Sequence, residues 1–121
     1  RLKGQLQGLA EGLLALQTGL GPRAWARTVV LCVSEFGRTV RPNGTAGTDH
    51  GTGGLALLAG GAVKGGRVHG DWPGLRPAQL FEGRDLRRVT DVRSLFATVL
   101  REHMGLEDPA LARVPALPGL V

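Results

Sequence analysis

Leucines at three- and four-residue steps open the chain and predict an amphipathic helix with one face toward a core. The leucines of this face are Leu2, Leu6, Leu9, Leu13, Leu16 and Leu20. The run Gly19-Leu20-Gly21-Pro22 should end the helix, because proline cannot continue it and glycine suits a helix C-terminus. Since Arg1 falls inside this pattern, we expect the chain to be part of a longer protein.

Two continuous apolar runs follow, residues 29–33 and residues 55–59. Unbroken apolar residues, as opposed to alternating ones, indicate strands buried on both faces. A helix followed by such a strand is half of a βαβ unit, which favours a parallel sheet. The pattern therefore predicts an α/β protein in which Cys32 is a small buried residue of the first strand.

The last clear element is a helix that begins after Thr90-Asp91, either of which can cap it, and ends at Gly105. Its apolar face would comprise Val92, Leu95, Phe96, Val99, Leu100 and Met104. Residues 109–121 contain three prolines and predict an extended segment on the surface.

The polar, glycine-rich segment between the two apolar runs, residues 34–54, is where chemistry concentrates. It carries Glu35, Arg38, Asp49 and His50 beyond the end of a predicted strand, where ligands bind in α/β proteins. Glu35 would need a cation or hydrogen-bond donors, either from Arg38 as a salt bridge or from a metal ion. Arg38 could instead hold a phosphate or sulfate group.

Asp49 and His50 are adjacent, so an extended backbone would point them to opposite faces, whereas a glycine-flanked turn could direct both at one ion. Carboxylate and imidazole ligands suit zinc, manganese or iron. An Asx-turn beside an exposed histidine explains the pair almost as well. His69 and Asp71 could add ligands from a second loop or be ordinary turn residues.

Composition narrows the classes of function. The net charge of +5 comes from scattered arginines, Tyr is absent and no basic block is interleaved with aromatic residues, so we expect no nucleic-acid partner. No apolar run approaches the roughly 18–20 residues of a membrane-spanning helix. One cysteine excludes an internal disulfide.

Four ordered motifs resemble the C-terminal part of a bacterial family, the domain of unknown function 1501, which is allied to the alkaline phosphatases and sulfatases. The motifs are Ser34-Glu35-Phe36-Gly37-Arg38-Thr39, Gly47-Thr48-Asp49-His50-Gly51, Gly65-Gly66-Arg67 with Gly70-Asp71-Trp72-Pro73-Gly74-Leu75, and Thr90-Asp91-Val92-Arg93-Ser94. The resemblance implies an alkaline-phosphatase-like α/β/α sandwich with a mostly parallel sheet, of which residues 1–121 form the C-terminal portion. It also implies an exported or periplasmic location.

The wider superfamily uses two metal ions and an Asp-His-Gly at the end of a late strand, with a further histidine in a later loop. Two alignments are possible. Either Glu35 and Phe36 replace that Asp-His and His50 is the later ligand, or Asp49-His50-Gly51 is the Asp-His-Gly itself. The position of the strand favours the first alignment. Phe36 cannot bind metal, however, which places two-metal hydrolysis in doubt.

The resemblance thus implies a metal-dependent hydrolase of phosphate or sulfate esters, with a small molecule or glycan as the substrate. His50, Asp49 and Glu35 would be ligands to a divalent ion, zinc or manganese, and Arg38 would bind the anion. The nucleophile would lie upstream, in the remainder of the same domain. The alternative is a non-catalytic module of the same fold, whose degenerate site binds an anionic glycan or a cell-surface partner.

Overall fold

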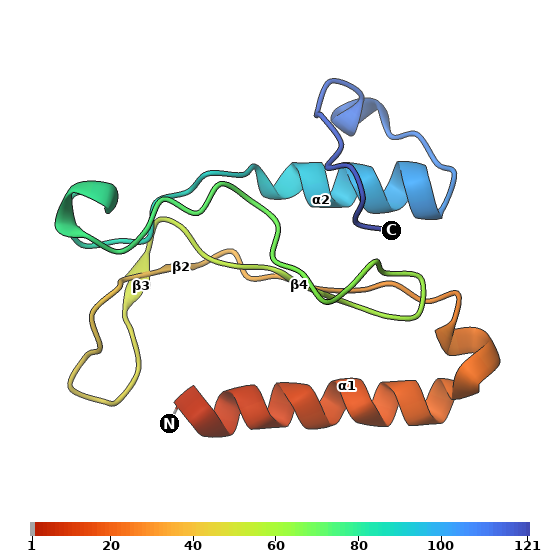
Figure 1. Ribbon diagram of the computed structural model, residues 1–121, viewed down its shortest axis with the longest axis horizontal. Coiled ribbons are helices and arrows are strands. Elements are labelled where there is room, and N and C mark those ends of the chain that lie inside the picture. Colours follow the sequence, from red (N-terminus) through yellow and green to blue (C-terminus); the bar gives the residue numbers. More distant parts are fainter. Residues whose placement is uncertain (1) are drawn as a thin grey trace.

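The computed structural model describes residues 2–121, and its first element is helix α1 (Leu2–Trp25) (Figure 1). The helix is interrupted at Gly21, whose φ of 70° and ψ of 170° are not helical, and Pro22 follows. Only glycine adopts such angles without strain. The predicted end of the leucine-rich helix is therefore correct, although a further turn continues to Trp25. No residue of α1 is buried.

Both predicted strands exist but are short. Strands β1 (Val30–Cys32) and β4 (Leu57–Ala59) pair antiparallel, with Leu31 opposite Leu58. The strands are only half-buried, so the prediction that the first apolar run, including Cys32, is fully buried is wrong for this chain. Both sheets found among residues 2–121 are antiparallel pairs. The mostly parallel sheet stays a prediction about the larger domain that the resemblance implies.

The second sheet pairs β2 (Gly37–Arg38) with β3 (His50–Gly51), also antiparallel. The C-terminal half contains helix α2 (Val92–Thr98), extended by a π-helical turn, η2 (Val99–His103). Two short 3₁₀ helices flank them, η1 (Pro77–Gln79) and η3 (Pro109–Leu111). Figure 1 shows α1 on one side of the strands and α2 with the C-terminal tail on the other.

The helix starts after Asp91, as the sequence predicts, but α2 itself ends at Thr98 and its π-helical extension η2 reaches the predicted end near Gly105. The side chain of Asp91 accepts a hydrogen bond from the backbone N–H of Arg93 at 2.9 Å, as an N-cap should. Beyond the π-helical turn, Gly105 has a φ of 66°, the left-handed conformation that commonly closes a helix. The Arg93 guanidinium also donates to the Asp91 carboxylate and lowers its pKa to about 2.

The C-terminal tail, residues 109–121, is held against α2 and η2 by polar contacts. The hydroxyl of Thr98, which is fully buried, donates to the Ser94 carbonyl at 2.6 Å and accepts from the backbone N–H of Leu117 at 2.8 Å. Arg101 donates to the carbonyl oxygens of Leu111 and Val114. These contacts bring Leu120 into the core, so the tail is packed more closely than a surface segment.

The hydrophobic core of the described chain is small. The buried apolar residues are Leu80, Ala97 and Leu120. The chain exposes 8706 Å², whereas a compact monomer of 12.7 kDa exposes about 6,200 Å². Most leucines of α1 contribute to this excess. Across residues 2–121, no helix has the length and apolar character needed to span a bilayer.

We expect residues 1–121, produced alone, to self-associate, because exposed apolar surface of this extent drives association. Light scattering after size-exclusion chromatography measures the effect. Leu9→Lys, within the leucine series of α1, should reduce association, whereas Gln5→Lys adds the same charge outside that series and should change it less. A monomeric wild-type chain that melts cooperatively would contradict this expectation.

The Asp91–Arg93 pair should make the free energy of unfolding depend on pH. The pKa of Asp91 in the folded chain, about 2, lies below its ordinary value of 3.8. The charged carboxylate therefore stabilises the fold fully above about pH 4, and this stabilisation is lost as the pH falls toward 2. In urea unfolding, wild type should exceed Asp91→Asn in stability near neutral pH, and the difference should vanish near pH 2. Asp108→Asn, which alters a cap with no arginine partner among residues 2–121, is the control.

Candidate functional site

Within residues 34–54, Gly37–Arg38 and His50–Gly51 form a short antiparallel ladder. The backbone N–H of Arg38 donates to the Gly53 carbonyl at 2.7 Å, and that of Thr39 donates to the Asp49 carbonyl at 3.1 Å. In the register of this ladder, Arg38 lies directly opposite His50. The chain between them turns back at residues 41–48, so both polar ends of the segment lie in one small sheet (Figure 1).

The glycines of this segment serve close packing of the backbone. An added Cβ at Gly51 would lie 2.6 Å from the backbone of Arg38, and one at Gly53 would lie 2.5 Å from the Leu86 carbonyl oxygen. Neither glycine has a positive φ. Side chains at these positions would push the neighbouring strands apart, so the glycine-rich composition reflects close approach more than flexibility.

A third segment, residues 84–86, pairs with the other edge of β2. The backbone N–H of Val40 donates to the Arg84 carbonyl, and the N–H of Leu86 donates to the Arg38 carbonyl, both at 3.0 Å. Strand β2 thus lies between β3 and this segment. The backbone N–H and carbonyl of Arg38 are both hydrogen-bonded, to Gly53 and Leu86, which fixes the base of its side chain.

Arg38 and His50 lie on the same face of the ladder, because directly paired residues of an antiparallel sheet share a face. Both residues are exposed. Nη1 of Arg38 donates to the Thr48 carbonyl at 3.0 Å. Among residues 2–121, the guanidinium forms no salt bridge with a carboxylate. Its remaining N–H groups are therefore able to bind an anion.

The imidazole ring of His50 stacks on the ring of Phe36, with the ring centroids 4.1 Å apart and the planes inclined by 8°. This contact orients the histidine while its nitrogens stay at the ring edge. Phe36 is 45% exposed, so the pair forms a small aromatic surface beside Arg38. Phe36 cannot bind metal, but its ring contacts the candidate ligand His50.

Asp49 is held by a different partner. Its Oδ1 accepts a hydrogen bond from Nδ2 of Asn43 at 2.8 Å, and its backbone N–H donates to the Thr39 hydroxyl at 3.1 Å. Oδ1 of Asn43 in turn accepts from the backbone N–H groups of Thr45 and Gly47. Asp49 is thus part of a turn network, separate from the stacked rings, although it adjoins His50 in sequence.

Glu35 is exposed and has no ion-pair partner among the described residues. The alternative of a Glu35–Arg38 salt bridge is therefore wrong for this structure. Glu35 also does not leave a buried strand, because Val33 is 44% exposed, so the predicted need for a cation does not arise. An exposed carboxylate is solvated and requires no partner.

His69 and Asp71 lie in an exposed, irregular segment, residues 64–72. Residues 2–121 contain no group of three or more His, Cys, Asp or Glu side chains arranged to hold a metal ion. Glu35, Asp49 and His50 therefore do not form a metal centre by themselves. A complete centre would need ligands from outside the described residues.

A buried carboxylate that the motifs did not single out organises the ladder. Asp85 is 3% exposed, and its carboxylate accepts from the Thr52 hydroxyl at 2.8 Å and from Nε of Arg84 at 2.7 Å. The Arg84 hydrogen bond, followed by that of Thr52, lowers the pKa of Asp85. No local signal indicates this role, because Thr52 lies 33 residues away in the sequence.

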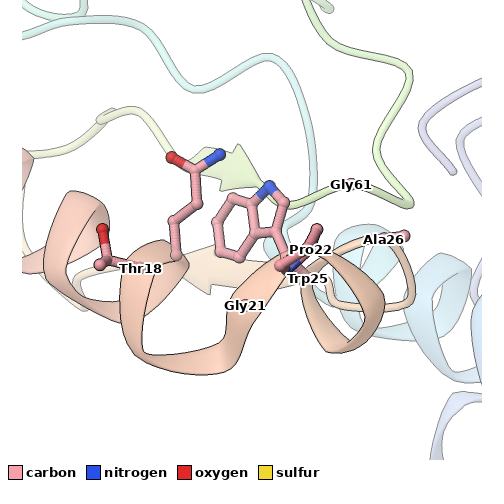
Figure 2. Close-up of a pocket in the computed structure, with 7 residues that line it drawn as sticks. Thr18, Gly21, Pro22, Trp25, Ala26 and Gly61 are labelled. Carbon is pink, nitrogen blue, oxygen red and sulfur yellow. The ribbon is translucent and has the colours of Figure 1, made fainter.

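A shallow cleft of about 430 Å³ lies elsewhere, at the break in α1. It is lined mainly by residues around Trp25, together with Gly61. Figure 2 shows the Trp25 indole ring standing at this cleft, between the helix and the chain at Gly61. None of the predicted site residues lines it. The candidate site is therefore an exposed face of the ladder, distinct from this cleft.

Comparison with known proteins gives one positive result. No curated protein and no solved structure matches the chain. A family model described as "Protein of unknown function (DUF1501)" matches residues 1–115. The chain therefore belongs to the DUF1501 family, as the four motifs indicate.

Proposed function

We propose that the β2–β3 face binds the oxyanion of a phosphate or sulfate ester. The observation that carries this proposal is the exposed pair of Arg38 and His50 on neighbouring strands. The Arg38 guanidinium has N–H groups without a carboxylate partner in residues 2–121, and it can bind two oxygens of one anion. The net charge of +5 supports the attraction of an anionic ligand.

In this proposal the chain is the C-terminal portion of an alkaline-phosphatase-like domain, and the domain as a whole is a metal-dependent hydrolase. The excess of exposed surface supports a larger domain, because α1 and the β1–β4 pair leave apolar area that the rest of a domain would cover. The resemblance supports the hydrolase and an exported location. The nucleophile would come from the upstream portion.

The described residues fit a metal site only in part. Asp49 and His50 offer carboxylate and imidazole groups, but the two side chains have different partners and belong to no three-ligand cluster within residues 2–121. In this proposal, zinc or manganese would take Asp49, His50 and Glu35 as some of its ligands and others from upstream. The part played by this chain's own residues is to bind and orient the anion.

A second function is favoured by the Phe36–His50 stack. An aromatic ring lies flat against His50 at 4.1 Å, and an aromatic surface beside an arginine suits the binding of an anionic glycan. A non-catalytic binding module would have this surface and need no metal. A screen of the full-length protein with phosphate and sulfate esters separates the two functions, because only the hydrolase turns over an ester.

We expect Arg38→Ala in the full-length protein to weaken binding of inorganic sulfate and phosphate by about 1.5 kcal/mol, roughly tenfold, through loss of a charged hydrogen bond. Arg38→Lys should recover only part of the affinity, since an ammonium group does not form the bidentate fork. Arg41→Ala is the matched control, because Arg41 is also exposed but lies outside the ladder. Isothermal titration calorimetry gives the affinities. If Arg38→Ala and Arg41→Ala lost the same anion affinity, the loss would come from the lower net charge and not from a site at Arg38.

Metal content tests the hydrolase. We expect His50→Ala and Asp49→Ala each to reduce bound metal strongly in the full-length protein, and Glu35→Ala to reduce it at least moderately, because each removes a proposed ligand. Arg38→Ala should leave the metal bound. Elemental analysis after purification, and again after addition of zinc or manganese, measures the stoichiometry. A wild-type protein that holds no metal under both conditions would rule out metal-dependent hydrolysis and leave the binding module.

A further inference from the structure

Asp85 is a charged group in an environment that charged groups usually avoid. Asp85 is 3% exposed. A carboxylate at such a buried position needs hydrogen bonds that replace those it would form with water. These hydrogen bonds come from Thr52, which follows β3, and from the neighbouring Arg84. Both partners stabilise the charged form of the carboxylate, consistent with its lowered pKa.

The position of Asp85 connects the two halves of the proposed anion site. Its backbone forms a bridge with Thr39, the residue after Arg38. Its side chain binds Thr52, two residues after His50. The segment that carries Asp85 therefore contacts the strand of Arg38 through backbone pairing. It contacts the end of the strand of His50 through the Asp85 carboxylate and through the hydrogen bond from the Gly53 N–H to the Leu86 carbonyl.

The β2–β3 ladder is short, and its other side-chain ties are those of Arg38 with Thr48 and of Thr39 with Asp49. It consists of two residue pairs, Gly37 with Gly51 and Arg38 with His50. The glycine pair has no side chains that could lock the alignment. A shift of one residue in such a ladder moves every side chain of a strand to the opposite face. His50 would then leave the face that it shares with Arg38.

We propose that Asp85 is a positioning residue that sets the register of β3 against β2 through Thr52 and so places His50 opposite Arg38. This inference rests on the proposed anion site for its functional consequence. Asp85 itself does not touch the anion. It acts through Thr52 on one strand and through the backbone pairing of residues 84–86 on the other.

The test uses four variants of the full-length protein with inorganic sulfate and phosphate as probes. Thr52→Val, which removes the hydroxyl donor, and Asp85→Asn, which removes the charge, should each weaken anion binding about tenfold through loss of a charge-assisted hydrogen bond and of the register. Thr52→Ser retains the hydroxyl and should restore affinity. Asp91→Asn is the matched control, because it disrupts another aspartate–arginine pair, at the start of α2.

A spectroscopic signal separates positioning from general stability. The ring of Phe36 shifts the NMR resonances of the stacked His50 imidazole protons, so the loss of register in Thr52→Val should move those resonances. Resonances of α2 should stay in place. In Asp91→Asn, resonances of α2 should move and those of the His50 imidazole should stay in place.

Three results would contradict either the positioning role of Asp85 or the proposed anion site. An unchanged His50 signal and unchanged affinity in folded Thr52→Val and Asp85→Asn would overturn the positioning role. A loss of affinity as large in Asp91→Asn would assign the effect to general stability and overturn it as well. If wild type binds neither sulfate nor phosphate, the proposed function fails, whereas the His50 signal still decides whether Asp85 sets the strand register.

Discussion

The buried carboxylate of Asp85 is the constraint on which the polar half of this chain depends. A charge at 3% exposure is tolerated because Thr52 and Arg84 donate hydrogen bonds to it. The requirement for those donors brings residues 84–86 against β2 and holds the end of β3 beside them. Three short segments that lack a hydrophobic core of their own are thereby joined into one ladder.

The rest of the chain relies on a different source of stability. Helix α1 has no buried residue, β1 and β4 are half-buried, and the accessible surface exceeds that of a compact monomer of this mass. Within residues 2–121, α2 and the tail bury Ala97, Leu120 and the Thr98 hydroxyl, and the remaining buried apolar residue is Leu80. The polar ladder can satisfy its hydrogen bonds internally, whereas the apolar elements need further surface to pack against.

The same division bears on function. The face that carries Arg38, His50 and Phe36 is positioned by contacts within the described residues, so the proposed anion site rests on this chain's own residues. The metal ligands that the family resemblance implies are not assembled by these residues alone. Membership of the DUF1501 family is established by the match over residues 1–115, while hydrolysis and anion binding are our proposals.

The sequence alone determined the features that depend on near neighbours. The break of α1 at Gly21, the cap at Asp91 and the close at Gly105 follow from the backbone preferences of single residues. The tertiary structure decided which distant segments meet. The bond between Thr52 and Asp85 and the pairing of Arg38 with His50 arise from backbone ladders that no local pattern specifies. Many registers satisfy the same alternation of polar and apolar residues, and the burial of one carboxylate selects among them.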